Sequence, residues 1–444
     1  MKNNILSLLL LCSSISFAQN QFSGISTSNR VGILNASINP AELTNLSNRF
    51  EVNIFGISVN ASNDQVSIGD LDSDTNFDEI LFKGNSPVNA RIDADIMGPS
   101  FAMKWKKWGF AITSKAYAKF DMVNVDPALG NAIINNDIPL NVTLLNYDSN
   151  QRLSGTTYGE IGLSVARTLI ENEKHKFSGG VTFKFLFPAS YSNFGLSELS
   201  GSITKVGGDS FLTTDAPASL NIAYSGNLAN SFTDSENYTK SIFGGFNGFA
   251  GDLGINYQLK KDNKYKLNVG FSIRNIGTMT YKDDNNYNTT YVFTTQNLPA
   301  LNLDSLSDVD NLADVEQILI AGGYLTKSPE KTKFDVKLPT SINAYIDYKI
   351  VSKLYVSAFL QQKVNKDETN EQITTPNLFS ITPRVNLGFF ETYIPVTFHE
   401  ISGTNVGFGF RLGGFYLGSS SLVTTLLNDS KQGDIYTGFR WGFL

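Results

Sequence analysis

Two adjoining segments of the chain, 249–260 and 264–276, alternate strictly between apolar and polar positions. The apolar positions are Leu253, Ile255, Tyr257 and Leu259 in the first segment and Tyr265, Leu267, Val269, Phe271 and Ile273 in the second. A period of two places the apolar side chains on one face of a β-strand and the polar side chains on the other. The lysine-rich residues between the segments predict a hairpin. Each segment has roughly the 9–11 residues that a tilted strand needs to cross a bilayer.

Two-faced segments of this kind recur along most of the chain. Further strands are expected at 49–60, 88–97, 100–106, 110–120, 157–169, 176–187, 218–224, 341–350, 353–363, 381–390, 393–401, 405–412, 414–419 and 435–443. Because every backbone polar group must be paired inside a bilayer, strands span it only as closed barrels. The sequence therefore predicts an all-β protein, a transmembrane antiparallel β-barrel of about 14 strands.

Charged residues on the polar faces of these strands are candidates for the barrel lumen. They are Lys184, Asp252, Arg274, Asp347, Lys349 and Arg411. In a barrel these side chains would line or plug the lumen, because the face that avoids lipid is polar. On a water-soluble sheet they would face solvent, and the pattern alone leaves both interpretations open.

Residues 1–18 have the features of a secretion signal. Lys2 supplies the positive charge, an apolar stretch follows, and Ser16-Phe17-Ala18 resembles a cleavage site. The apolar stretch is too short for a membrane-spanning helix. The single cysteine, Cys12, falls in this segment, so the mature chain is expected to have no disulfide framework. The net charge of −6 argues against a nucleic-acid partner.

The remaining chain divides into an N-terminal segment and a barrel with inserts. Residues 19–48 show no clear period, and the barrel is expected at 49–444. Three longer inserts interrupt the strands, at 61–86, 225–247 and 283–335. The last insert includes a helix candidate at 309–321, where apolar residues share one face. Because outer-membrane barrels keep their periplasmic turns short and their extracellular loops long, the inserts are assigned to the cell exterior.

The order of these segments resembles a known group of barrels. The similar features are Asn39-Pro40-Ala41 before the first strand, the strand Gly251-Asp252-Leu253-Gly254-Ile255-Asn256-Tyr257 paired with one ending Arg274-Asn275-Ile276-Gly277, and the terminal Asp434-Ile435-Tyr436-Thr437-Gly438-Phe439. The group is the long-chain fatty-acid transporter (FadL) superfamily with its Bacteroidota-type relatives, including PorV-like secretion components. The chain is more similar to an outer-membrane barrel family of that phylum known only as a domain of unknown function.

The resemblance implies a place in the bacterial outer membrane and a hatch that plugs the barrel. Residues 19–48 would form this hatch, with Asn39, Pro40 and Ala41 inside the lumen. No ligand-binding residue of the transporters matches a position in this chain, so none is carried over.

The sequence offers little catalytic chemistry. Of its two histidines, His175 lies in a charged turn, and His399 has Ser402 nearby but no evident third group to orient a Ser-His pair. We therefore expect a protein that is not an enzyme.

An acidic stretch is the one candidate metal site. Oxygen ligands stand at alternate positions, as in calcium loops, at Asp70, Asp72, Asp74, Asn76 and Asp78. Thr75 replaces the glycine of the sharp turn, and Leu81 stands where the closing acid should be. A solvated acidic loop is therefore favoured over a Ca²⁺ site, and no other cofactor is expected.

Two functions follow from the barrel interpretation, and both assume a monomer surrounded by outer-membrane lipid. The first is a passive FadL-like channel for small hydrophobic molecules that move past the N-terminal plug. The second is a non-transporting platform that docks secretion or cell-surface proteins through the long inserts. A soluble, secreted β-sandwich or solenoid adhesin is a third reading of the same alternation.

Overall fold

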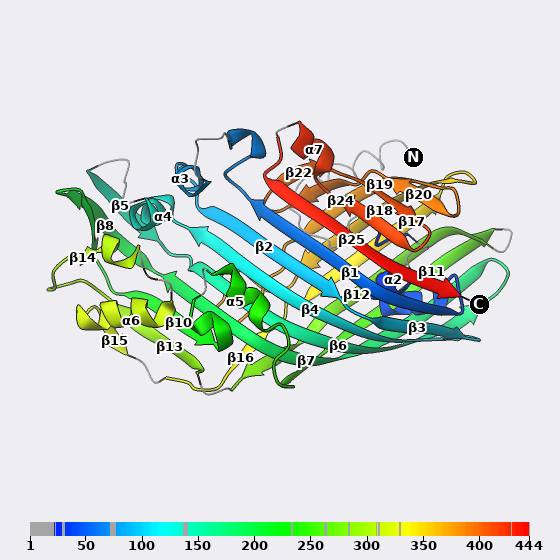
Figure 1. Cartoon of the computed structure of the whole chain (residues 1–444), viewed down its shortest axis with the longest axis horizontal. Helices are drawn as coiled ribbons and strands as arrows, with labels where there is room; N and C mark the ends of the chain where they lie inside the picture. Colours follow the sequence, from blue (N-terminus) through cyan, green and yellow to red (C-terminus); the bar gives the residue numbers. More distant parts are fainter. Residues whose placement is uncertain are drawn as a thin grey trace.

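A computed structural model describes residues 22, 24–28, 32–71, 77–135, 141–231, 234–261, 264–282, 285–307, 309, 311–327, 330–427 and 429–443. The expected signal, residues 1–18, lies outside this described part. The strands form a closed antiparallel barrel of 14 strands, which confirms the predicted fold class (Figure 1).

The barrel wall follows the chain order around the ring. Its strands are β1 (Phe50–Asn63), β2 (Val88–Met97) with β3 (Ser100–Trp105), β4 (Trp108–Val125), β6 (Gln151–Glu171), β7 (His175–Ser197), β11 (Gly248–Lys261), β12 (Lys264–Tyr281), β17 (Ser341–Lys349), β18 (Leu354–Lys363), β19 (Leu378–Asn386), β20 (Phe390–Tyr393) with β21 (Val396–His399), β22 (Gly403–Val406) with β23 (Phe408–Leu412), β24 (Phe415–Ser419) and β25 (Gln432–Phe443). The last strand closes the ring on the first, with Phe443 opposite Phe50 and Gln432 opposite Ser62.

Two details of the wall differ from the sequence expectation. The segments 88–97 and 100–106 are two parts of one wall position, since β2 and β3 both pair with β1 and β4 on either side of Gly98-Pro99. Proline has no N–H for the ladder, so it interrupts the strand. The segment 218–224 is a strand, β10 (Ala218–Ser225), but it pairs with the distal part of β7 and with β13 (Tyr287–Phe293) rather than within the ring.

The wall carries apolar side chains outside and polar side chains inside. The exposed apolar residues include Ile57, Val59, Ile112, Leu163, Phe183, Leu253, Ile255, Phe271, Ile346, Ile381 and Phe408. Alternate positions on the wall strands are buried and polar, for example Asp93, Thr182, Asn256 and Ser357. Aromatic residues gather toward both ends of the wall, with Trp105, Trp108 and Trp441 at one end and Phe243, Phe246 and Phe249 at the other. An apolar band between aromatic girdles is typical of barrels that sit in lipid.

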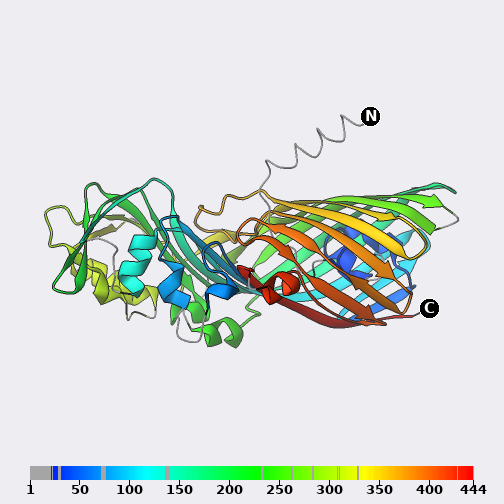
Figure 2. The same cartoon turned by 90° about the horizontal axis from the view of Figure 1, so that it is seen from above.

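Short turns lie at the end of the barrel that holds the C-terminus, and a second body rises from the opposite end (Figures 1 and 2). We call this body the extension. Beyond β10 and β13 it contains β15 (Leu325–Lys327), a second sheet of β5 (Val142–Tyr147), β8 (Leu199–Val206), β9 (Asp209–Thr214) and β14 (Leu301–Asn302), and the helices α4 (Pro127–Ile134), η4 (Gly226–Ala229), α5 (Ser235–Lys240), η5 (Leu303–Leu306) and α6 (Leu312–Ala321). Its core is apolar and includes Leu199, Ile203, Leu212, Ile222 and Phe293.

The inserts expected from the sequence contribute to this end of the molecule. α6 begins after Asn311, whose side chain accepts a hydrogen bond from Asp314 N at 2.8 Å, and falls within the expected helix at 309–321. Strand β16 (Phe334–Lys337) pairs with the distal part of β12. The helices η3 (Ile68–Asp70), α3 (Phe77–Leu81) and α7 (Leu422–Leu426) complete the loops. Every helix in the described ranges is too short or too polar to traverse a bilayer.

Candidate functional site

The N-terminal segment lies inside the barrel. We call residues 22, 24–28 and 32–48 the inner segment; it contains α2 (Ile33–Ala36) and η2 (Pro40–Asn45). Figure 2 shows this segment enclosed by the strands near the C-terminal end of the wall. Asn39 caps η2 by accepting a hydrogen bond from Ala41 N at 3.0 Å, and Pro40 suits the first helical position because it needs no donor there.

Asn39 also fastens the inner segment to the wall. Its side-chain amide donates to Ile255 O at 2.8 Å and to the Tyr345 hydroxyl at 3.2 Å. Two wall glycines permit this close approach. A Cβ on Gly180 would lie 2.6 Å from Ala41 N, and one on Gly254 would lie 2.0 Å from Asn39 Oδ1. At Gly180 the wall and the inner segment therefore meet backbone to backbone, and at Gly254 the wall backbone meets the Asn39 side chain.

Glu42 is the centre of a buried polar cluster beside this contact. Asn256 and Asn268 donate to Glu42 Oε1 at 2.8 and 2.9 Å, and Tyr345 donates to the same oxygen. Asn45 donates to Oε2 at 2.8 Å. All of these donors are neutral, so hydrogen bonds rather than an ion pair hold the carboxylate in the lumen. The sequence analysis did not single out Glu42, although it directly follows Asn39-Pro40-Ala41.

Lys184 and Asp252 form a buried ion pair on the extension side of the inner segment. Lys184 Nζ lies 3.0 Å from Asp252 Oδ2 and 3.4 Å from Glu160 Oε2. Asp252 Oδ1 accepts from Asn275 N at 2.7 Å. Arg274 lines a small cavity between the wall and the inner segment, together with Asp95 and Lys115. Glu160 was not predicted, because its partners come from other strands.

A second charged group occupies the opposite wall. Arg384 Nη2 lies 2.9 Å from Asp347 Oδ2, and Arg384 Nε lies 3.2 Å from Glu391 Oε1. Arg411 Nη2 also lies 3.2 Å from Glu391 Oε2. All four side chains are buried. Lys349 stands apart from this group: it is half-buried, and its Nζ lies 6.0 Å from the centre of the Tyr355 ring.

The end of the lumen that faces the extension is also closed. A loop at 364–377 joins β18 to β19 and reaches the far wall, where Arg152 donates to Asp367 O at 3.1 Å and Asn193 donates to Asn370 Oδ1 at 3.0 Å. Thr374 accepts from Arg91, whose guanidinium also pairs with Asp121 at 2.5 Å. Ile373 of this loop is fully buried. The lumen is therefore filled from both ends.

The other sequence candidates bring no reactive group together. His399 Nδ1 accepts from Ser402 N at 3.1 Å, whereas the Ser402 hydroxyl donates to Gln432 Oε1 at 2.8 Å, so the serine is not activated by the histidine. Asp70 accepts from Ser67 as a helix cap. The candidate ligands Asp72, Asp74 and Asn76 and the side chain of Asp78 lie outside the described residues. Within the described ranges, no cluster of three or more histidine, cysteine or acidic residues is arranged to hold a metal.

Sequence comparison places this barrel in a family. A family model described as a family of unknown function, DUF5723, matches residues 40–420. The chain belongs to the DUF5723 family. The match begins at the first residue of η2 and includes the wall from β1 to β24, the extension and the loop at 364–377. Among proteins with curated descriptions, none has a sequence that matches this DUF5723 member.

The chain is also similar to several solved structures at very low sequence identity. The Pseudomonas putida toluene transporter TodX is 10% identical, with 96% of this chain and 98% of that chain covered and a TM-score of 0.43. A Pseudomonas aeruginosa FadL homologue is 8% identical, with 96% and 98% covered and a TM-score of 0.40. The translocator domain of the autotransporter NalP from Neisseria meningitidis is 8% identical, with 88% of each chain covered and a TM-score of 0.32.

Proposed function

We propose that this DUF5723 protein is a bacterial outer-membrane barrel through which a small hydrophobic molecule passes when the inner segment moves. The observation that carries the proposal is the inner segment itself, which fills a closed barrel whose outer face is apolar. A barrel whose lumen is filled in this way can pass a molecule only when the inner segment is displaced.

The contacts of the inner segment are non-covalent, which allows reversible movement. They include hydrogen bonds, such as Asn39 to Ile255, Thr44 to Ser178 and Ser272 to Ile38, and a buried apolar cluster that the inner segment shares with wall side chains. Each such bond contributes about 0.5–1.5 kcal/mol net, because water replaces it when it breaks. The segment pairs with no wall strand, so its release leaves the β-ladder intact.

The region above the inner segment supports a hydrophobic cargo. Ile373 of the loop at 364–377 packs in a cluster of aromatic and aliphatic side chains that also includes Tyr117, Tyr158, Tyr191, Met279, Tyr281, Phe334 and Leu338. A molecule entering past that loop would meet these side chains first. The neighbouring charges of Lys184, Glu160 and Asp252 are paired with one another.

A reversible cross-link tests the proposal. The hydroxyls of Thr44 and Ser178 lie 2.9 Å apart, so Thr44→Cys/Ser178→Cys should form a disulfide between the inner segment and β7. The single native cysteine, Cys12, is replaced by serine in every variant. In liposomes containing the oxidised protein, uptake of small aromatic molecules should stop, and a reductant should restore it.

Each single-cysteine variant is the matched control and should respond to neither oxidant nor reductant. A variant lacking residues 22–48 keeps only the closure by the loop at 364–377, so its uptake should exceed that of the oxidised, cross-linked protein. Equal uptake by the oxidised, reduced and truncated proteins would rule out gating by the inner segment. Heat-modifiable mobility and membrane fractionation test the outer-membrane assignment separately.

The extension favours a docking platform as a second candidate. Its edge strand β5 pairs with β8 alone among the described strands, and Leu144 on β5 is 80% exposed. An unprotected apolar edge strand is a surface to which another chain can add a strand. Cross-linking in outer membranes, with Leu144→Lys as the variant that should lose the partner, separates this candidate from transport. A stable partner together with no conductance would favour the platform.

A further inference from the structure

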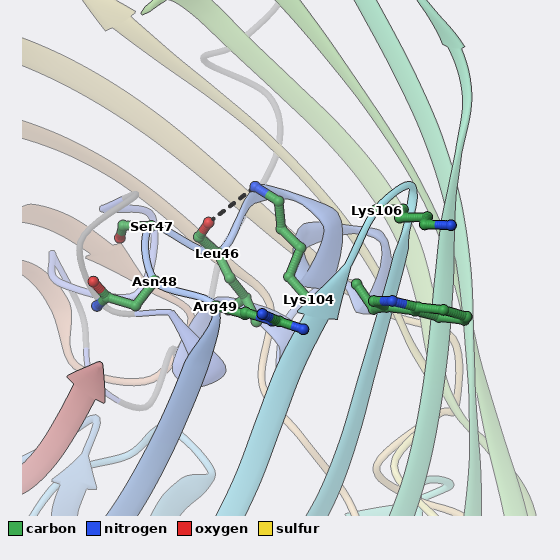
Figure 3. A pocket seen from close by; sticks show the side chains of 7 residues that line it. Leu46, Ser47, Asn48, Arg49, Lys104 and Lys106 are labelled. Atoms are coloured by element: carbon green, nitrogen blue, oxygen red, sulfur yellow. Dashed lines mark hydrogen bonds between the residues drawn. The ribbon is translucent and has the colours of Figure 1, made fainter. Parts of the chain in front are cut away.

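A pocket lies where the inner segment passes into the first wall strand. It has a volume of about 430 Å³ and is lined by Leu46, Ser47, Asn48, Arg49, Lys104, Trp105 and Lys106. Figure 3 shows the chain from Leu46 to Arg49 facing the β3–β4 hairpin, which carries Lys104 and Lys106. Three of the lining residues are cationic, and none is acidic.

The contacts of the three cations leave their positive charge available. Lys104 Nζ donates to a backbone carbonyl, Leu46 O, at 3.2 Å. The Arg49 guanidinium lies 5.3 Å from the centre of the Phe50 ring, and Lys106 Nζ lies 5.3 Å from that of Trp105. These partners orient the cations without neutralising them.

The acidic residue that acts on Lys104 is already engaged. Glu171 attracts Lys104 through space, but its carboxylate lies 3.0 Å from Lys260 Nζ. The pocket therefore keeps an excess of positive charge.

The surrounding aromatic residues indicate the level in the membrane at which the pocket would lie. Trp105 and Trp108 face outward at the paired ends of β3 and β4, beside Phe50 and Phe443 on β1 and β25. Tryptophan and tyrosine gather at the boundary between lipid tails and headgroups. Phosphate groups of phospholipids lie at the same level.

We propose that this pocket binds a phosphate group. A tetrahedral phosphate presents several oxygens at once, so it can accept from the forked guanidinium of Arg49 and from the Lys104 ammonium group, while the charge of Lys106 at the edge of the pocket adds to the attraction. A phospholipid headgroup and free phosphate offer this same chemistry.

Binding would also act on the inner segment. Lys104 Nζ ties the end of that segment to β3 through Leu46 O, and a bound phosphate competes for the same ammonium group. An occupied pocket therefore weakens this hydrogen bond near the end of the inner segment. This link to passage rests on the proposed function, whereas phosphate binding itself does not.

The test uses the full chain with the double variant Lys104→Gln/Lys106→Gln. Calorimetric titration with inorganic phosphate, in detergent and chloride buffer, measures the free anion. The second arm measures lipid binding. The protein is placed in vesicles of phosphatidylglycerol mixed with a galactolipid that contains no phosphate and is then transferred to detergent. Phosphorus analysis measures the phosphatidylglycerol that the protein retains. The double variant should bind at least tenfold more weakly in whichever arm the native protein binds. Lys83→Gln, an exposed lysine far from the pocket, is the matched control and should bind normally.

The two arms distinguish the source of the phosphate. Retained phosphatidylglycerol without a calorimetric signal identifies a headgroup site, and the reverse identifies a site for free phosphate. Absence of binding in both arms, or unchanged binding by a double variant with normal heat-modifiable mobility, overturns the proposal. Neither arm measures uptake. A negative result with the Thr44→Cys/Ser178→Cys cross-link would therefore leave this result unaffected.

Discussion

The barrel and the extension place their apolar residues on opposite sides. In the extension, Ile203 and Leu212 are fully buried in a core, as in a water-soluble domain. In the barrel, Ile57 and Ile255 are exposed on the outer face, whereas Arg384 and Lys184 are fully buried. The extension thus buries its apolar side chains, whereas the barrel exposes them and buries charged side chains.

The difference indicates two surroundings. Apolar side chains avoid water, so the face that presents them continuously is the face that meets lipid. Buried arginine and lysine are tolerated only where partners satisfy them, as Asp347 and Glu391 do for Arg384. The boundary between the two arrangements runs along β6 and β7, whose proximal halves belong to the wall and whose distal ends support the extension.

The largest loss of stability is expected from breaking the ion pairs in the lumen. Arg384→Ala leaves Asp347 and Glu391 buried without their shared partner, which should lower the free energy of unfolding by about 3–5 kcal/mol. Chemical unfolding in lipid vesicles, followed by far-UV circular dichroism, measures the change. The control is Lys331→Ala, which breaks an exposed pair with Glu371 and should cost no more than about 1 kcal/mol. Equal losses in the two variants would mean that the lumen is open to water.

The extension should respond to a loss of apolar volume instead. Ile203→Ala removes buried methyl groups from its core and should cost about 2–5 kcal/mol. Limited proteolysis should show cleavage within the extension while the barrel keeps its heat-modifiable mobility. Loss of that mobility would show that the two regions unfold as one unit.

The strands could be predicted from the sequence because a period of two is a local signal. Alternation at 253–259 and 265–273 became the β11–β12 hairpin, with Leu253 opposite Ile273 and Tyr257 opposite Val269. The same signal did not separate wall strands from others. β10 has the alternation of a wall strand, but its partners β7 and β13 place it in the extension.

The polar interior depends on pairings distant in the sequence. Asp347 and Arg411 stood out by their position on a strand face, but Arg384 and Glu391, which join them, gave no local signal. Glu42 lies in a segment without periodicity, and its donors Asn256, Asn268 and Tyr345 come from three different strands. Such contacts arise only when the ring closes around the inner segment.

A charge placed on the outer face gives the next largest effect. Ile255→Lys, near the middle of β11, should destabilise the protein in lipid by about 2–4 kcal/mol, because lysine at the bilayer midplane is poorly solvated. Val206→Lys is the matched change on an exposed residue of the extension and should stay within about 0.5 kcal/mol. Unfolding in vesicles compares the two. Similar losses of stability in the two variants would mean that water surrounds both regions, and would contradict a position of the barrel in the membrane.

The smallest effect compares two asparagine helix caps. Asn39 caps η2 in the lumen, and Asn302 caps η5 in the extension by accepting from Asp304 N at 2.9 Å. Asn302→Ala should cost about 1 kcal/mol and leave conductance unchanged, since it removes one cap. Asn39→Ala removes a cap and also leaves Ile255 O and the Tyr345 hydroxyl without this donor, so it should weaken docking of the inner segment by about 1–3 kcal/mol. A loss of about 1.4 kcal/mol would raise the ratio of displaced to docked inner segment about tenfold. Planar-bilayer recordings should therefore show openings in Asn39→Ala that Asn302→Ala lacks, and equal recordings would mean that the inner segment is a fixed part of the barrel.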